Sequence, residues 1–370
     1  MEVAAFRSAV RAWLDRHDLT PPAGSRHSLE AELAQLSRVR RALYEAGWMR
    51  YGWPEAVGGL GGSALLRAVL GEEIAARDLA DPGSYSMIEV LVPTMISYAP
   101  PGLAAQMVPL LLSGKEQWCQ GFSEPGSGSD LASLSTRAVQ RGDEWVITGQ
   151  KVWTSLAQYA ARCVLLTRTA LGPPDKHSGI TAFFVDMSCP GITVRPLRTM
   201  HGVDEFAEVF LDEVVVPGSR MLGQPGDGWR LACDLLPYER STCFWHRSAY
   251  LLRRLDRLVT SAALTPADEA AIGAAYLALY TTRCRSRETQ YRLANAGTLG
   301  PETSVDKILL QAAEQQLYDT ARDLLPGEVE LNSSRWRSEY LYSRAATIYG
   351  GTAEIQRNII ARRLLDLGKE

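Results

Sequence analysis

Two short segments of the sequence carry residue types that could hold a flat, polar ligand. Residues 120–130 (QGFSEPGSGSD) combine glycines, serine hydroxyls and exposed backbone N–H groups, which can approach such a ligand closely and donate hydrogen bonds to it. Residues 149–155 (GQKVWTS) place an indole beside two hydroxyls. That combination suits a ring system on which the indole packs while a hydroxyl reaches a ring nitrogen or oxygen. Each segment alone also has a structural explanation, as a connecting loop or as a tryptophan that covers a core.

Taken together, the two segments resemble the signature of the acyl-CoA dehydrogenase family. Three further stretches resemble elements of that family and follow in the same order along the chain: residues 53–59 (WPEAVGG), 210–217 (FLDEVVVP) and 349–357 (YGGTAEIQR). Each short element is weakly specific, whereas the ordered combination over most of the chain is highly specific. The resemblance implies a flavoenzyme that carries FAD and acts on an acyl-CoA thioester.

The resemblance also assigns cofactor contacts. Trp153 would pack on the isoalloxazine, Thr154 or Ser155 would bond its pyrimidine or N5 edge, and Ser129 would lie near both flavin and acyl-CoA. The full set of expected FAD contacts is Gln120, Phe122, Ser123, Gly128, Ser129, Trp153, Thr154, Ser155, Thr352 and Glu354.

The family reaction requires a carboxylate that removes the α-proton of the thioester. In many members this base is the Glu of a Y-E-G-T motif, but the matching position here is Gly350. In isovaleryl- and long-chain-type members the base instead precedes an Arg on the first long helix of the C-terminal domain, which matches Glu239-Arg240. We therefore expect Glu239 to be the base, although a solvated Glu-Arg pair at a helix start would look the same. Expected substrate contacts are Ser129, Arg240, Tyr349, Gly350 and Gly351, and the acyl group is expected to be branched, long or polycyclic.

The sequence departs from the family where a neighbouring subunit would contact FAD. An R-x-x-F-G element is absent from residues 258–270, and a Q-x-x-G-G-x-G segment is absent from residues 324–336. Candidate phosphate partners in this half of the site are Arg283, Arg285, Arg287 and Lys307. The chain could thus form a homodimer or homotetramer, or be a mainly structural subunit of a hetero-oligomer. An acyl-carrier-protein thioester as substrate, or oxygen as the oxidant, also remain open; by resemblance the electron acceptor is an electron-transferring flavoprotein.

The elements that must position these residues follow the order helices, strands, helices. Helical spacing of apolar residues covers much of residues 1–115, including a stretch from about Met87 to Leu112, and returns after residue 226. Between them lie short runs rich in β-branched and aromatic residues, among them 163–167, 180–185 and 209–216. We expect an α+β chain with an N-terminal helical domain (1–115), a central antiparallel β-barrel or sandwich (116–225) and a C-terminal helical bundle (226–370). By resemblance the bundle has four helices.

Composition narrows the alternatives. A chain of 370 residues is longer than a single hydrophobic core usually serves, so two or three domains are expected. The net charge of −3, with Lys and Arg scattered along the chain, argues against a nucleic-acid-binding surface. The six cysteines include no C-x-x-C pair and the five histidines are isolated, so we expect neither a disulfide framework nor a metal site. Residues 1–16 lack the apolar core of a signal peptide, and no run of about 18 apolar residues exists. These features predict a cytoplasmic protein without a membrane span.

Overall fold

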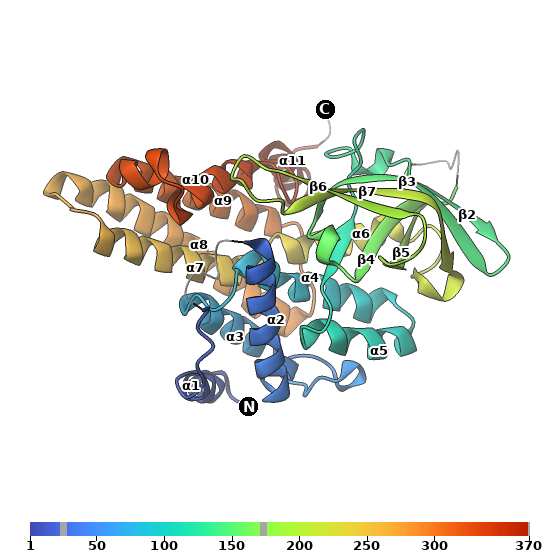
Figure 1. The fold of residues 1–370 in the computed structure, drawn as a ribbon, viewed down its shortest axis with the longest axis horizontal. Helices are drawn as coiled ribbons and strands as arrows, with labels where there is room; N and C mark the ends of the chain where they lie inside the picture. Colours follow the sequence, from blue (N-terminus) through green and yellow to red (C-terminus); the bar gives the residue numbers. More distant parts are fainter. Residues whose placement is uncertain (23–27, 171–175, 369–370) are drawn as a thin grey trace.

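The computed structural model describes residues 1–22, 28–170 and 176–368. It confirms the predicted order of helices, strands and helices. In Figure 1 the first helices lie at the bottom, the sheet at the upper right and the last helices at the upper left. The three parts meet at the middle of the molecule, where the ends of the sheet face helices from both sides.

Helices form the N-terminal part of the chain. In the described residues they are α1 (Val3–Leu14), α2 (Leu29–Glu45), α3 (Ala64–Ala76), α4 (Pro82–Tyr98) and α5 (Pro101–Leu112). Local capping fixes their starts: the Asp81 side chain accepts a hydrogen bond from Ser84 N at 2.8 Å where α4 begins. The expected helix from Met87 to Leu112 is two helices, because a proline pair, Pro100-Pro101, interrupts the helical hydrogen bonds.

The central part is one sheet. Its strands are β1 (Trp118–Gly121), β2 (Arg137–Arg141), β3 (Glu144–Ser155), β4 (Arg162–Arg168), β5 (Ile180–Asp186), β6 (Ile192–Leu197), β7 (Phe206–Pro217) and β8 (Met221–Leu222). The order is β6-β7-β3-β2-β4-β5-β8, and β1 pairs with β4. The sheet is mixed rather than wholly antiparallel, because β1 and β2 each pair with β4 in parallel.

Helices return after the sheet. They are α6 (Gly228–Glu239), α7 (Thr242–Ser261), α8 (Glu269–Ala296), α9 (Thr303–Leu324), α10 (Arg335–Ser343) and α11 (Ala353–Ile359). A loop separates α8 from α9, and Gly297 ends α8 with a φ of 71° that favours glycine. In the described residues, no helix is both long and hydrophobic enough for a membrane crossing.

Strand β4 shows how the sheet joins two cores. Val164 and Leu166 pack with the N-terminal helices, whereas Cys163 and Leu165 belong to the core on the other side of the sheet. Buried on both faces, the strand reads as a continuous apolar run. A rigid, doubly covered sheet of this kind gives the loops at its ends a fixed base.

Candidate active site

The loop that follows β1 is held by a buried ion pair. Glu124 Oε1 lies 2.8 Å from Lys151 Nζ, and the two side chains are 5% and 1% exposed. The same carboxylate accepts hydrogen bonds from Ser135 N (2.7 Å) and Thr136 N (2.8 Å). Burial alone would raise the pKa of Glu124, but the Lys151 cation and these hydrogen bonds lower it to about 2. The pair ties the loop to β3, so the two segments singled out from the sequence form one unit.

The end of β3 turns two neighbouring side chains in opposite directions. The pairing of β3 with β7 shifts register between Lys151 and Thr154, and Trp153 has a φ of 59°. Such an irregularity re-aims side chains. Trp153 is 60% exposed and meets Phe206 edge-on at 5.9 Å, whereas Thr154 is 1% exposed. The exposed indole and the buried hydroxyl thus lie side by side at the edge of the sheet.

Glu239 reaches the same region from α6. It is the last residue of that helix and is partly buried, so it is not a solvated residue at a helix start. Acidic residues are disfavoured at helix C-termini, which means that the helix dipole does not explain its presence. Gln120 Nε2, from the end of β1, donates a hydrogen bond to Glu239 Oε2 at 2.8 Å. The structure therefore brings together the expected base and an expected cofactor contact.

Gly350 provides the space that the Glu239 carboxylate occupies. A Cβ placed on Gly350 would lie only 3.1 Å from Glu239 Oε1, and the φ of Gly350 is 65°. The Gly350 carbonyl accepts hydrogen bonds from Arg240 Nε and from Gln356 Nε2, both at 3.0 Å. Burial lowers the pKa of Arg240, while the charge of Glu239 opposes that shift. Glu239, Arg240 and the turn at Gly350 form one contact group, which we call the Glu239–Gly350 cluster.

The remaining predicted residues lie around this cluster in different ways. Phe122 is buried and its carbonyl accepts from Lys151 Nζ at 3.2 Å, and the Ser123 carbonyl accepts from Val152 N at 2.9 Å. Thr352 caps α11 by accepting from Ile355 N at 3.3 Å. Ser155, Tyr349 and Gly351 are half-buried, while Gly128, Ser129 and Glu354 are exposed. No hydrogen bond or ion pair among the described residues joins Ser129 or Glu354 to the Glu239–Gly350 cluster.

Two buried atoms without hydrogen-bond partners bear on whether a flavin fits between the end of β3 and the Glu239–Gly350 cluster. Thr154 Oγ1 and Gln120 Oε1 are buried without a hydrogen-bond partner. Such orphaned groups are rare unless a ligand or water satisfies them. A hydroxyl and an amide carbonyl suit the pyrimidine edge of a flavin, which carries both N–H and C=O groups, and Trp153 offers a ring face beside them. The residues present thus fit FAD.

Sequence reasoning missed three residues that build the site. Glu124 and Lys151 lie inside the segments that drew attention, yet only the fold reveals that they pair. Gln356 lies in the stretch 349–357 that resembles the family, but its role was not predicted: its side-chain amide donates hydrogen bonds to the Gly350 and Gly351 carbonyls. The sequence signal for this role was the position of Gln356 in the first turn of a helix, six residues after Gly350.

The expected phosphate partners are mostly engaged elsewhere. Arg285 Nε lies 2.7 Å from Asp306 and Arg283 lies 3.5 Å from Glu72. Lys307 is 2% exposed, so it is not available to a phosphate from a neighbouring subunit.

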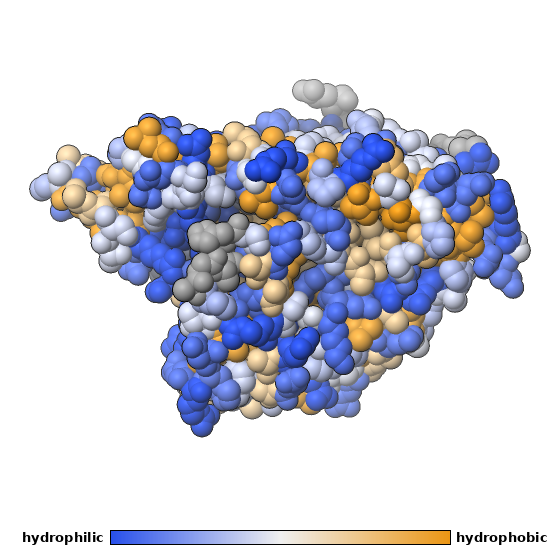
Figure 2. Space-filling view, viewed as in Figure 1, coloured by the Kyte–Doolittle hydropathy of each residue, from blue (hydrophilic) through white to orange (hydrophobic). Residues whose placement is uncertain are grey.

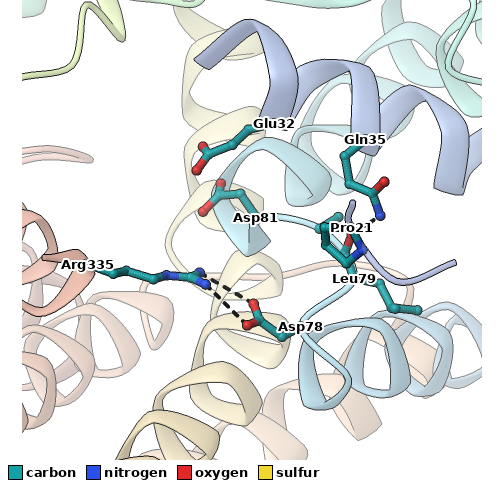
Figure 3. Close-up of a pocket in the computed structure, with 8 residues that line it drawn as sticks. Pro21, Glu32, Gln35, Asp78, Leu79, Asp81 and Arg335 are labelled. Atoms are coloured by element: carbon teal, nitrogen blue, oxygen red, sulfur yellow. Dashed lines mark hydrogen bonds and ion pairs between the residues drawn. The ribbon is translucent and has the colours of Figure 1, made fainter. Parts of the chain in front are cut away.

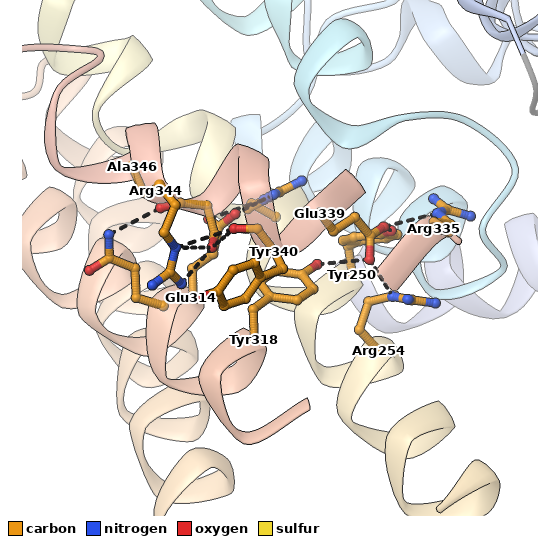
Figure 4. A network of polar contacts seen from close by, with 12 residues as sticks. Tyr250, Arg254, Glu314, Tyr318, Arg335, Glu339, Tyr340, Arg344 and Ala346 are labelled. Atoms are coloured by element: carbon orange, nitrogen blue, oxygen red, sulfur yellow. Dashed lines mark hydrogen bonds and ion pairs between the residues drawn. The ribbon is translucent and has the colours of Figure 1, made fainter. Parts of the chain in front are cut away.

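Two cavities lie at the junction of the N-terminal helices with α7 and α10. The smaller, of about 30 Å³, is shown in Figure 3, where Arg335 reaches Asp78 across it. The larger, of about 850 Å³, adds His201, Glu205, Arg247 and Tyr342 to its wall. Many of its charged groups are already paired: Figure 4 shows Glu339 bound by Arg335, Arg254 and Tyr250. Neither cavity is lined by Glu239, Arg240 or Gly350, but Tyr342 of the larger cavity packs against Tyr349, with ring centres 5.9 Å apart.

Comparison with known proteins identifies the family of the chain. Family models match most of the sequence in three consecutive parts: acyl-CoA dehydrogenase N-terminal domain (residues 1–115), middle domain (119–214) and C-terminal domain (226–365). The chain belongs to the acyl-CoA dehydrogenase family. It is thus an oxidoreductase of a flavoprotein family of lipid metabolism.

Several relatives in this family resemble the chain over its full length. The acyl-CoA dehydrogenase IpdE1 of Mycobacterium tuberculosis is 37% identical, and the match covers 100% of this chain and 99% of the relative. FadE34 of the same organism is 36% identical over 99% of this chain and 54% of its own length. Among solved structures, a steroid ACAD, Tcur3481-Tcur3483, superposes with a TM-score of 0.87 at 26% identity, covering 100% of both chains. A glutaryl-coenzyme A dehydrogenase, at 22% identity and a TM-score of 0.84, shares the fold.

Proposed function

We propose that the chain catalyses FAD-dependent α,β-dehydrogenation of an acyl-CoA with a bulky acyl group, with Glu239 as the base. One observation carries the proposal: the Glu239 carboxylate lies where a side chain at residue 350 would be, 3.1 Å from that Cβ position. A carboxylate reaching this point from α6 replaces the one that the Y-E-G-T pattern would supply from residue 350. Family membership supports the reaction type.

The proton step uses the groups of the Glu239–Gly350 cluster. Glu239 takes the α-proton of the thioester, and the Gly350 N–H would bond the thioester oxygen, where negative charge develops. Arg240 and Gln356 fix the turn by binding the Gly350 carbonyl. Tyr349 and Gly351 flank the same turn and complete the proposed substrate contacts, together with Ser129.

The cofactor would be held by the edge of the sheet. Thr154 and Gln120 offer the unpartnered atoms, Trp153 the ring face, and the loop 122–129 its backbone. Ser155, Thr352 and Glu354 would complete the contacts from the end of β3 and the start of α11. Bound FAD supplies the acceptor for the hydride that leaves Cβ, and we propose an electron-transferring flavoprotein as the next acceptor.

One similar structure supports a bulky, polycyclic acyl group. One solved structure that superposes over the whole chain is described as a steroid ACAD.

The test is the Glu239→Gln variant, loaded with FAD and mixed with a panel of linear, branched and polycyclic acyl-CoA thioesters. We expect flavin bleaching in a stopped-flow instrument to slow by a factor of about 10² to 10⁴, with FAD content unchanged. Asp256→Asn, an exposed acid on α7, is the matched control and should behave as wild type. Full activity of Glu239→Gln would disprove the assignment of the base. Bleaching only by acyl-carrier-protein thioesters, or fast reoxidation in air, would assign the chain to those related reactions instead.

We also propose that the chain works as an oligomer, through an exposed face of α8. Leu277, Cys284 and Tyr291 are exposed and spaced by seven residues, which places them on one side of the helix, and Tyr276 stacks on Tyr280 beside them. Figure 2 shows apolar residues among polar ones at the left-hand end, where Figure 1 places α8. Exposed apolar side chains that gather in this way mark interaction surfaces. A second copy of the chain or a related subunit would fit, and a solved ChsE4-ChsE5 complex shows that this fold occurs in mixed pairs.

A further inference from the structure

Lys307 lies under the turn that carries Gly350. It belongs to α9 and is 2% exposed, which is rare for a lysine. Its ammonium donates a hydrogen bond to the Ala346 carbonyl and lies 4.2 Å from the centre of the Tyr349 ring. Its Cε is 3.5 Å from the position that a Cβ on Gly350 would take. Since Glu239 Oε1 is 3.1 Å from that same position, the lysine and the carboxylate border one small space.

Among the charged groups of the described residues that act on Lys307, Glu239 is the carboxylate that has no cation bound to it. Burial lowers the pKa of Lys307 to about 8, while the carboxylates of Glu314 and Glu239 oppose the shift and Arg240 adds to it. Glu314 is already paired with Arg247. Glu239, by contrast, accepts its hydrogen bond from the uncharged amide of Gln120. Arg240, the other nearby cation, directs its Nε to the Gly350 carbonyl.

We propose that Lys307 is a positioning residue for the dehydrogenation: it fixes the turn at Gly350 through the Ala346 carbonyl and holds a positive charge beside the space that the Glu239 carboxylate borders. The inference rests on the proposed function of Glu239. A base can take the α-proton only in its carboxylate form, and a cation close to it in a water-poor site stabilises that form. The ammonium also lies on the face of Tyr349, an arrangement that favours the charged lysine.

The test compares the pH dependence of flavin reduction in three FAD-loaded variants. Lys307→Met removes the charge and the donor, Lys307→Gln removes the charge but keeps a donor, and Lys307→Arg keeps both. For Met and Gln we expect the acidic limb of the rate–pH profile to move up by about one unit, so that rates on that limb fall about tenfold relative to the wild type, because below the pKa of a base each unit is a tenfold change in its ionised fraction. Near pH 9, where Lys307 of the wild type is largely neutral, the rate of Gln should approach wild type, whereas Met, which also lacks the donor to the Ala346 carbonyl, should stay lower. Arg should keep the wild-type limb.

The possible results distinguish an effect of the Lys307 charge from a structural effect of the substitution and from failure of the proposed function. A lower rate that is uniform across pH in Met and Gln, or an unchanged profile, would overturn the inference. If Lys307→Met does not fold or loses FAD, the comparison of Gln with Arg decides: a limb that moves in Gln alone supports the inference, and a limb at the same pH in both overturns it. Failure of the proposed function would look different, since the wild type itself would then not be bleached by any thioester.

Discussion

At the scale of single residues, Glu239 and Gly350 act as a matched pair. The carboxylate enters from the end of a helix, and the glycine on the opposite segment leaves the space that it fills. The glycine also satisfies a backbone with a φ of 65°, which residues with a Cβ rarely adopt. Residue 350 must therefore both lack a side chain and adopt a positive φ. We expect its substitution to affect the reaction more than folding.

Gly350→Ala is expected to slow flavin reduction by about tenfold or more, because a Cβ 3.1 Å from Glu239 Oε1 displaces the base, and small misplacements cost up to 10²-fold. The control is Gly297→Ala, which has a similar φ of 71° but nothing within 4 Å of its Cβ position. Both variants should lose about 1 kcal/mol of stability through the backbone alone, seen as similar decreases in melting temperature. Equal reduction rates in the two variants would contradict the proposed geometry.

At the scale of elements, the Glu124–Lys151 pair couples the loop after β1 to β3. Both side chains are buried, and the carboxylate also binds backbone N–H groups. Removing one partner of a buried pair leaves an uncompensated charge, at a cost of about 3–5 kcal/mol, whereas removing both costs less. The lowered pKa of Glu124, to about 2, means that its stabilisation is present above its ordinary pKa near 4.5 and is lost as the pH falls from there towards 2.

Glu124→Gln and Lys151→Met should each lower the melting temperature and weaken FAD retention, since each breaks the link between loop and strand. The double variant should recover part of the loss in melting temperature. Thermal unfolding with flavin release as a second signal measures both effects. Strictly additive losses in the double variant would show that the two side chains do not act as a pair.

The Glu124–Lys151 pair should also contribute to the loss of stability at acidic pH. Between pH 4.5 and 2 the melting temperature of Glu124→Gln should fall less steeply than that of the wild type, because the variant has no carboxylate to protonate there. Parallel curves would assign the acid sensitivity to other groups.

At the scale of the whole molecule, α8 extends to one end (Figure 1), and several of its apolar side chains are exposed. Tyr276, Leu277, Tyr280 and Tyr291 are each about half exposed or more. Burying such a face between subunits would remove this apolar surface from water, with a gain of about 25 cal/mol per Å².

Leu277→Glu should therefore shift the protein to a smaller species in sedimentation or light scattering, because a charge in the middle of an apolar interface is costly. Leu331→Glu, at an equally apolar residue that is 81% exposed but not on α8, is the control. An unchanged mass for Leu277→Glu, or an equal shift for Leu331→Glu, would remove α8 from the interface.

Much of this architecture can be predicted from the sequence, because it depends on local patterns. Helical spacing and alternation identify the three parts of the chain, and short motifs identify the family. The absence of a carboxylate at residue 350 is itself a sequence fact, and it directs attention to Glu239. Proline positions could also have predicted the division into α4 and α5, since they block helical hydrogen bonds locally.

Only the tertiary structure decides which distant residues meet. Gln120 on Glu239, Glu124 with Lys151, and Lys307 beneath Gly350 are contacts between segments far apart in the chain. Their energies depend on burial and on the approach of opposite charges, which no local pattern encodes. Lys307 shows the difference most clearly: as a residue type on a helix it looked available to a phosphate, whereas the fold buries it beside the proposed base.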